Sequence, residues 1–139
     1  MNFHIDVVSL NGTVFSGEVK EVTLPTSEGV ISVLAKHMPY VAPLTVGEVI
    51  LHKDGGNLNF SIGKGIFSMA DNSATLLIED ETMSEEISEE KAAEAKKKAE
   101  ELIAKGVSKE EKLQAVYTLR KSLVDLKIAR RKRKVSMGG

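Results

Sequence analysis

The chain has 139 residues, of which 42% are hydrophobic, and it contains no cysteine. This length suits one domain, or a small domain with an appendage, and the lack of cysteine excludes disulfides, thiolate metal sites and cysteine nucleophiles. The net charge of −1 is unevenly distributed. Residues 1–80 hold 4 Lys, no Arg and 9 acidic residues, whereas residues 81–139 hold 15 Lys or Arg and 11 acidic residues. We therefore expect two structural units with different partners.

The N-terminal sequence MNFHIDVVSL lacks the basic region and the long apolar region of a signal peptide. No apolar run approaches the roughly 20 residues that a helix needs to cross a bilayer. We expect a soluble protein that does not insert directly into a membrane.

The first half of the chain predicts β-strands. Phe3, Ile5 and Val7 alternate with polar residues, which is typical of a half-buried strand. Similar short runs occur at 18–24, 29–34, 47–52, 58–63 and 74–80. The strongest hairpin signal is Asp54-Gly55-Gly56, which lies between two of these runs. Frequent turns without a helical crossover before residue 85 favour an antiparallel β-sandwich or a flattened barrel.

From residue 85 the composition changes to Ala, Glu and Lys, which predicts two helices. Ser88 is the expected N-cap of the first helix and Gly106 its C-terminal glycine, while Ser108 and Glu111 form a capping box for the second. The short connection predicts an antiparallel hairpin. Its apolar faces are Ala92, Ala95, Ala99, Leu102 and Ile103 on the first helix, and Leu113, Val116, Leu119, Leu123 and Leu126 on the second. An Ala-rich face buries little area, so we expect the two helices to be weakly held together.

The sequence predicts no catalytic site and no metal site. His37 has no Asp, Glu or His at a ligand spacing, which argues against zinc. Ser27 and Ser32 lack both a nucleophile-elbow motif and an acidic partner. The glycines of residues 55–65 match neither a Walker motif nor a dinucleotide-binding motif. His37 is best interpreted as a structural or interface residue.

The C-terminal segment KIARRKRKV places six cations in the eight positions 127–134. Three interpretations remain open from composition: a solvated helix end, a nucleic-acid patch without aromatics for base stacking, or a surface for an acidic protein partner. Arg120 and Lys121 extend the same charge back along the helix, which favours an extended complementary surface.

The order of these elements resembles a known family. The stretch FSGEVKEVTLPTSEGVISVLAKHMPYVAPLTVGEV (15–49), followed by a glycine-containing hairpin, ATLLIED and an Ala/Glu/Lys helix pair, is similar to the epsilon subunit of F-type ATP synthases. The resemblance implies an α+β fold, with a sandwich over residues 1–84 and a helical hairpin over residues 85–139. It also implies a non-catalytic rotor subunit that couples rotation to ATP synthesis and inhibits ATP hydrolysis.

The resemblance implies three sets of partner contacts and no nucleic-acid partner. The turn Glu28, Gly29, Val30 and Ile31 would face the membrane ring of c subunits, although Val30 stands where the family commonly has an acid. His37, Met38 and Pro39 would lie near the gamma subunit of the central stalk. When the hairpin extends, the cations would meet an acidic segment of the catalytic beta subunits; the candidates are Arg120, Lys121, Lys127, Arg130 and Arg131.

Some family members also bind ATP through an I/L-D-x-x-R-A motif. The matching residues are Ile87, Lys91 and Ala92, joined by Arg120, but Ser88 replaces the Asp and Lys91 replaces the Arg. Lys keeps the charge and loses the bidentate fork. No cofactor is required, and regulatory ATP would bind weakly.

Two alternatives from other classes remain, namely an ATP-sensing helical hairpin and a basic-tailed nucleic-acid-binding sandwich. The expected location is the cytoplasmic face of the bacterial plasma membrane, as a peripheral subunit, with an organelle-encoded equivalent left open.

Overall fold

The computed structural model describes residues 1–138, with side chains up to residue 135. The chain forms two compact units, one covering Met1–Glu81 and one beginning at Thr82. The first unit contains nine strands: β1 (Phe3–Ser9), β2 (Gly12–Val19), β3 (Glu21–Thr26), β4 (Gly29–Leu34), β5 (Tyr40–Leu44), β6 (Gly47–Lys53), β7 (Gly56–Ile62), β8 (Lys64–Ala70) and β9 (Ser73–Glu79). The second unit contains β10 (Thr82–Met83), the 3-10 turn η1 (Ser84–Glu86), α1 (Glu89–Ala104) and α2 (Lys109–Gly138).

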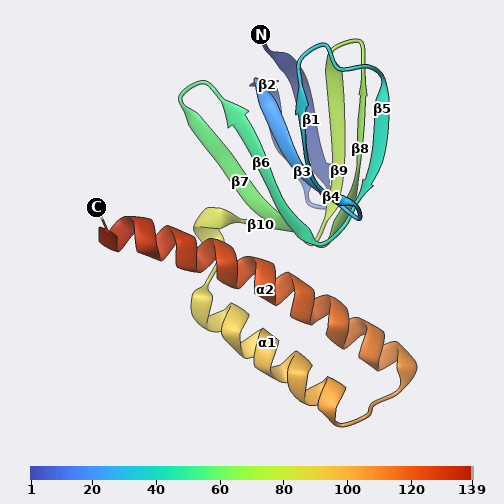
Figure 1. The fold of residues 1–139 in the computed structure, drawn as a ribbon, viewed down its shortest axis with the longest axis vertical. Helices are drawn as coiled ribbons and strands as arrows, with labels where there is room; N and C mark the ends of the chain where they lie inside the picture. The colour runs from blue at the N-terminus through green and yellow to red at the C-terminus, as the bar shows by residue number, and fades with distance from the viewer. Residues whose placement is uncertain (139) are drawn as a thin grey trace. The chain divides into compact units, whose positions relative to one another are not determined.

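The strands of the first unit form two layers (Figure 1). One sheet has the order β2-β1-β9-β8-β5, and the other runs β7-β6-β3-β4 within this unit. The sandwich followed by two helices is the predicted fold class. Neighbouring strands are antiparallel except β1 and β9, which pair in parallel from His4–Ser73 to Ser9–Ile78. This pair needs no helical crossover, because the whole chain between the two strands makes the connection.

The core lies between the two sheets and is filled by alternate residues of each strand. Phe3, Ile5 and Val7 are at most 1% exposed, as the alternation predicts. Phe60 and Phe67 contribute the largest buried side chains from the other strands. Because side chains alternate between the two faces of a strand, each strand also presents an outer face.

The hairpin predicted at Asp54-Gly55-Gly56 is the one that joins β6 and β7. Gly55 and Gly56 have φ angles of 86° and 132° in the β6–β7 turn, a conformation that glycine adopts at little cost. Three strands of the first unit were not predicted: β2, β5 and β8. β5 contains Pro43, which usually argues against a strand but is compatible with the sheet edge where β5 lies.

The predicted helix caps are confirmed. Ser88 Oγ accepts a hydrogen bond from the Lys91 amide at 3.2 Å, and Ser108 Oγ accepts one from the Glu111 amide at 3.2 Å. Gly106 has a φ of 70°, as expected for a glycine that ends a helix. The two helices form the predicted hairpin (Figure 1).

The predicted leucine stripe of α2 is wrong at two positions, because Leu113 is 63% exposed and Leu123 is 47% exposed. The buried positions are mostly small and recur every seven residues: Ala92 and Ala99 on α1, and Ala115, Ser122 and Ala129 on α2. Small residues at this spacing let two helices approach closely, while Leu126 and Ile128 are large side chains of α2 that are also buried. The expected weakness of the helix contact remains a prediction.

We predict that Gly47→Ala destabilises the sandwich. A Cβ at Gly47 would lie 2.4 Å from Pro25 Cβ, in a ring that cannot rotate away. The expected loss in the free energy of unfolding is about 1–3 kcal/mol, measured by urea unfolding followed through the NMR signals of sandwich amides. Gly17→Ala is the matched control, since its Cβ would meet only the Phe15 ring, at 3.1 Å. Equal stability of the two variants would contradict the prediction.

Candidate functional site

The β3–β4 turn is an ordered, exposed tip. Thr26 Oγ1 donates a hydrogen bond to the Gly29 carbonyl at 2.6 Å and accepts one from the Glu28 amide at 3.3 Å. Gly29 has a φ of 121°, so the turn needs glycine there. Val30 is 72% exposed, and Ile31 is half-buried. The four predicted ring-facing residues therefore run from the turn at Glu28 into the start of β4.

The loop between β4 and β5 carries the predicted stalk-facing residues His37, Met38 and Pro39. His37 Nδ1 lies 2.7 Å from the Met38 carbonyl oxygen, and the imidazole ring meets Tyr40 edge-on at a centroid distance of 5.4 Å. Tyr40 continues this contact to the buried ring of Phe67 at 6.4 Å. His37 thus connects the loop to the core by ring packing, while Met38 remains 77% exposed.

Asn72 fixes the start of the same loop. Its Oδ1 accepts a hydrogen bond from the Lys36 amide at 2.7 Å, and its Nδ2 donates one to the Asn2 carbonyl at 3.0 Å. Lys36 has a positive φ of 62°, which the hydrogen bond helps to hold. The loop is therefore ordered even though four of its residues, 36–39, are exposed.

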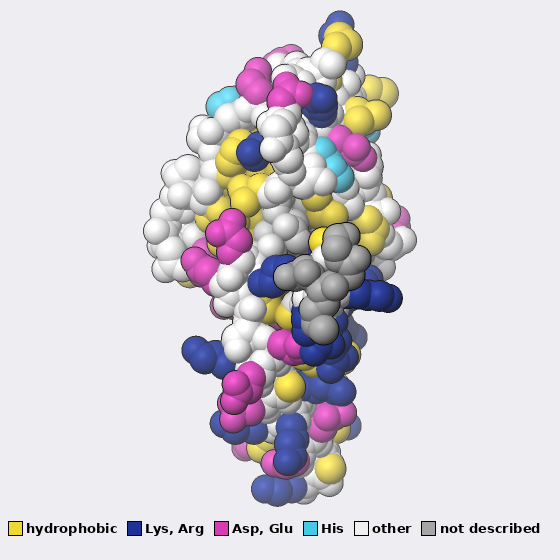
Figure 2. All heavy atoms as spheres, turned by 90° about the vertical axis from the view of Figure 1, so that its left-hand side faces the viewer, with side chains coloured by type: hydrophobic (Ala, Val, Ile, Leu, Met, Phe, Trp, Pro, Cys, Tyr) yellow, Lys and Arg dark blue, Asp and Glu magenta, His cyan; other side chains and the backbone are white. Residues whose placement is uncertain are grey.

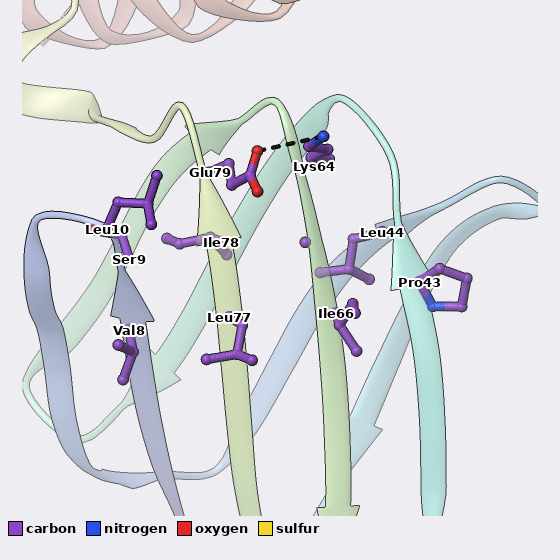
Figure 3. Close-up of a pocket in the computed structure, with 11 residues that line it drawn as sticks. Val8, Ser9, Leu10, Pro43, Leu44, Lys64, Ile66, Leu77, Ile78 and Glu79 are labelled. Carbon is purple, nitrogen blue, oxygen red and sulfur yellow. Dashed lines mark ion pairs between the residues drawn. The ribbon is translucent and has the colours of Figure 1, made fainter.

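An apolar surface on the outside of the β1-β9-β8-β5 sheet was missed by the sequence analysis. It surrounds a hollow of about 690 Å³, whose lining includes Leu10, Ile66 and Leu77 (Figure 3). These side chains are 91%, 51% and 50% exposed. At the edge of the hollow, Lys64 Nζ and Glu79 Oε2 form an ion pair of 3.4 Å. We call Leu10, Ile66 and Leu77 the apolar face.

One signal for the apolar face was present in the sequence. In β9 the buried residues alternate strictly, with Leu76 inside, so that Leu77 must point outward. A leucine in a position that alternation assigns to solvent indicates an exposed hydrophobic patch. Ile66 on β8 carried no such signal, because β8 itself was not predicted.

The helical unit carries most of the cations, intermixed with acids (Figure 2). Arg120 and Lys127 are exposed. Lys121 is only 14% exposed, and its Nζ lies 3.3 Å from Asp125 Oδ2 and 3.1 Å from Thr82 Oγ1. The five predicted cations therefore do not form a uniform exposed row.

The remaining two predicted cations lie near the C-terminal end of α2. Arg130 Nε lies 3.4 Å from Glu89 Oε1, which belongs to the first turn of α1. Arg131 is exposed and takes part in interactions of its own. Glu89 also accepts a hydrogen bond from Arg133, at 3.0 Å. This role of Glu89 was not predicted from the sequence.

Of the four candidate ATP residues, two are buried and two are exposed. Ile87 is 8% exposed and packs with Ile128 and Ala129, while Ala92 is 7% exposed. Lys91 and Arg120 are exposed. Ile87, the first residue of the motif, therefore contributes to the packing of the two helices. The exposed Lys91 is available to an anionic ligand.

Two exposed carboxyl groups elsewhere in the sandwich have lowered pKa values. A hydrogen bond from Ser16, at 2.6 Å, and one with His4 lower the pKa of Asp6. The hydrogen bond and charge of Lys20 lower the pKa of Asp54. Both acids lie away from the three surfaces described above.

Within the described residues, no group of three or more His, Asp or Glu is placed to hold a metal ion. None of the helices in that part of the chain combines the length and apolarity that a membrane span requires.

The chain is similar to known proteins of one family. Residues 2–83 match the family model described as "ATP synthase, Delta/Epsilon chain, beta-sandwich domain". ATP synthase epsilon chain 1 of Methylococcus capsulatus is 33% identical over 135 residues, covering 96% of each chain.

Two solved structures share the fold. A chain in the OSCP/F1/c-ring structure of the Euglena gracilis mitochondrial ATP synthase aligns with a TM-score of 0.79 and 21% identity, over 87% of this chain and 77% of that one. A chain in the central stalk/c-ring structure of the Tetrahymena thermophila mitochondrial ATP synthase aligns with a TM-score of 0.67 and 13% identity, over 91% and 95%. The match to the sandwich family model and the relative that is similar along nearly its whole length show that this chain belongs to the epsilon-chain family of F-type ATP synthases.

Proposed function

We propose that this epsilon chain is a non-catalytic subunit of the ATP synthase rotor that couples rotation to ATP synthesis and inhibits ATP hydrolysis through its helices. The observation that carries the proposal is the similarity along nearly the whole chain to an epsilon chain, in a protein that has both the sandwich and the hairpin. Two structures that share the fold are the OSCP/F1/c-ring structure of one mitochondrial ATP synthase and the central stalk/c-ring structure of another. As a rotor component it would be a peripheral subunit on the cytoplasmic face of the bacterial plasma membrane.

The apolar face is the surface best suited to the gamma subunit of the central stalk. Leu10, Ile66 and Leu77 together present a large apolar area around one hollow (Figure 3). Covering such a patch with a permanent partner removes apolar area from water, at about 25 cal/mol per Å². The loop with His37 and Met38 enters β5, the edge strand of the same sheet, at Tyr40, whereas Leu44 at the other end of β5 lines the hollow. The proposed docking surface therefore extends along β5.

The β3–β4 turn is the proposed contact with the ring of c subunits. It projects as an ordered tip, and its Glu28 carboxylate is available for polar contacts. Val30 replaces the acid that the family commonly carries there, so the contact would include an apolar component.

The hairpin is the proposed inhibitory element. In its extended form, cations of α2 would meet the acidic segment of the catalytic beta subunits. α2 has 30 residues, so it spans roughly 45 Å at 1.5 Å per residue. Arg120 and Lys127 are already exposed, whereas Lys121 and Arg130 would have to leave their partners Asp125 and Glu89.

ATP is the proposed regulatory ligand of the closed hairpin. The exposed cations Lys91 and Arg120 would contact its phosphates. Binding would be weak, since the Lys91 ammonium makes a point contact where a guanidinium would form two parallel hydrogen bonds.

Replacing Ile66 and Leu77 together by Ser should weaken binding to the isolated gamma subunit by about tenfold or more, because apolar anchors dominate interface energy. Isothermal titration calorimetry measures the change. Leu34→Ser is the matched control, because Leu34 is 58% exposed on β4 of the other sheet. If the control variant loses as much affinity as the double variant, the apolar face is not the stalk surface.

Truncation after Glu86 should raise the ATPase turnover of the assembled catalytic head severalfold relative to the full chain, because it removes every candidate inhibitory cation while keeping the sandwich. Turnover is measured with saturating amounts of each form. Binding of both forms to the gamma subunit provides the control. Unchanged turnover with intact binding would leave a rotor subunit whose hairpin does not inhibit.

Calorimetry with magnesium and ATP should give a dissociation constant of about 0.1–1 mM for the isolated chain. Lys91→Gln should abolish the heat of binding, whereas Lys97→Gln, at an exposed position on the same helix, should preserve it. Equal binding by both variants would exclude Lys91 from the site.

A further inference from the structure

We propose that Glu89 is an electrostatic latch that keeps the helical hairpin closed by holding the end of α2 against the start of α1. The two carboxylate oxygens divide the contact between them. Oε1 accepts from Arg130 Nε at 3.4 Å, and Oε2 accepts from Arg133 Nη1 at 3.0 Å. We call Glu89, Arg130 and Arg133 the Glu89 latch.

The position of Glu89 strengthens these pairs. Ser88 caps α1, so Glu89 is the first helical residue and lies at the positive end of the helix dipole. Its side chain is 31% exposed, compared with 58% for Arg130 and 59% for Arg133. A half-buried carboxylate is less screened by salt than a fully exposed one. Arg130 and Arg133 contact different oxygens of Glu89, so they do not compete for the same acceptor.

Other contacts reinforce the same end of the hairpin. Ile87 packs against Ile128 and Ala129 directly beside the latch, with Val124 partly buried against them. Lys132 Nζ donates a hydrogen bond to the Ser84 carbonyl. Polar and apolar contacts therefore coincide where α1 begins and α2 nears its end.

The loop end of the hairpin is held differently. There Ala95, Ala99, Leu102 and Ala115 line an open groove of about 320 Å³. Large side chains near it remain exposed, with Leu102 at 40%. A groove at the loop end and a reinforced contact at the other end mean that opening begins when the Glu89 latch breaks, with the loop at Gly106 as the pivot.

This device deepens the proposed inhibitory function and rests on that function for its consequence. In the closed hairpin, Glu89 holds Arg130, one of the candidate inhibitory cations, together with Arg133. An acidic segment therefore has to compete with Glu89, and the latch sets how readily the hairpin changes from closed to extended.

Amide hydrogen exchange of the full chain tests the latch without any partner. A released α1 of 16 residues would be only marginally helical in water, so the exchange of its amides reports hairpin opening. Glu89→Gln should speed exchange across α1 by about 3- to 10-fold, as expected for losing two partly exposed ion pairs. The sandwich amides should be unchanged. In 1 M salt the wild-type protein should approach the rate of the variant, because the Debye length falls to about 3 Å.

Glu90→Gln is the matched control, because Glu90 shares the first turn of α1 and the same dipole, but is exposed and forms no ion pair among the described side chains. If Glu89→Gln exchanges at the wild-type rate, or if Glu90→Gln accelerates exchange equally, the proposal is overturned. ATPase inhibition by the same variants separates the two hypotheses. If no form of the full chain inhibits the ATPase, the inhibitory function is refuted and the exchange result still decides on the latch, whereas unchanged exchange refutes the latch whatever the ATPase result.

Discussion

Burial of one face of every strand between the two sheets is the constraint on which the sandwich depends. The core contains no Trp, so Val, Ile and Leu from both sheets supply most of it, with Phe3, Phe60 and Phe67 as its largest members. Strict alternation fixes which residues point inward and leaves the other set facing out. Pro25 and Gly47 show how tightly the strands pack, since even one methyl group at Gly47 would overlap the proline ring. The outward set is therefore free to carry binding surfaces.

Those outer surfaces differ in character. The β1-β9-β8-β5 sheet presents an apolar face around one hollow, while β3 and its neighbours carry polar pairs such as Thr23 with His52, at 2.8 Å. The first kind of surface gains free energy when a partner covers it, and the second is already satisfied in water. This contrast is the physical basis for proposing the apolar face as a docking surface. His37 adds to it by joining an exposed loop to the core through Tyr40.

The helical hairpin is stabilised by different means. Five of its buried positions are small residues at seven-residue spacing, which lets the helices approach closely, and Leu126 and Ile128 are its large buried side chains. Ion pairs and a small apolar cluster at one end add to the contact between the two helices. A contact that depends on charges is sensitive to salt and to competing acids, whereas the sandwich core is not. Such a division suits a rigid docking unit joined to a helical element that changes shape.

The sequence by itself determined the local structure and the two-part organisation. Alternation in β1, the glycines of the β6–β7 turn and the caps at Ser88 and Ser108 were all readable, because each depends on near neighbours in the chain. The order of motifs in residues 15–49 also indicated the family. Strands β2, β5 and β8 were missed because Gly or Pro interrupts their apolar runs, although β2 and β8 pair with their chain neighbours β1 and β9.

Only the tertiary structure decided which residues meet across long separations. The parallel pairing of β1 with β9 joins strands some 70 positions apart, at His4 and Ser73. Leu113 and Leu123 lie on a stripe of correct period, yet close helix packing selected the small residues and left these leucines exposed. The partners of Lys121, Arg130 and Arg133 were equally unreadable, because periodicity assigns a side chain to a face but cannot say which charge faces it. Periodicity is a property of neighbours along the chain, whereas the apolar face and the Glu89 latch form only after the strands and helices pack.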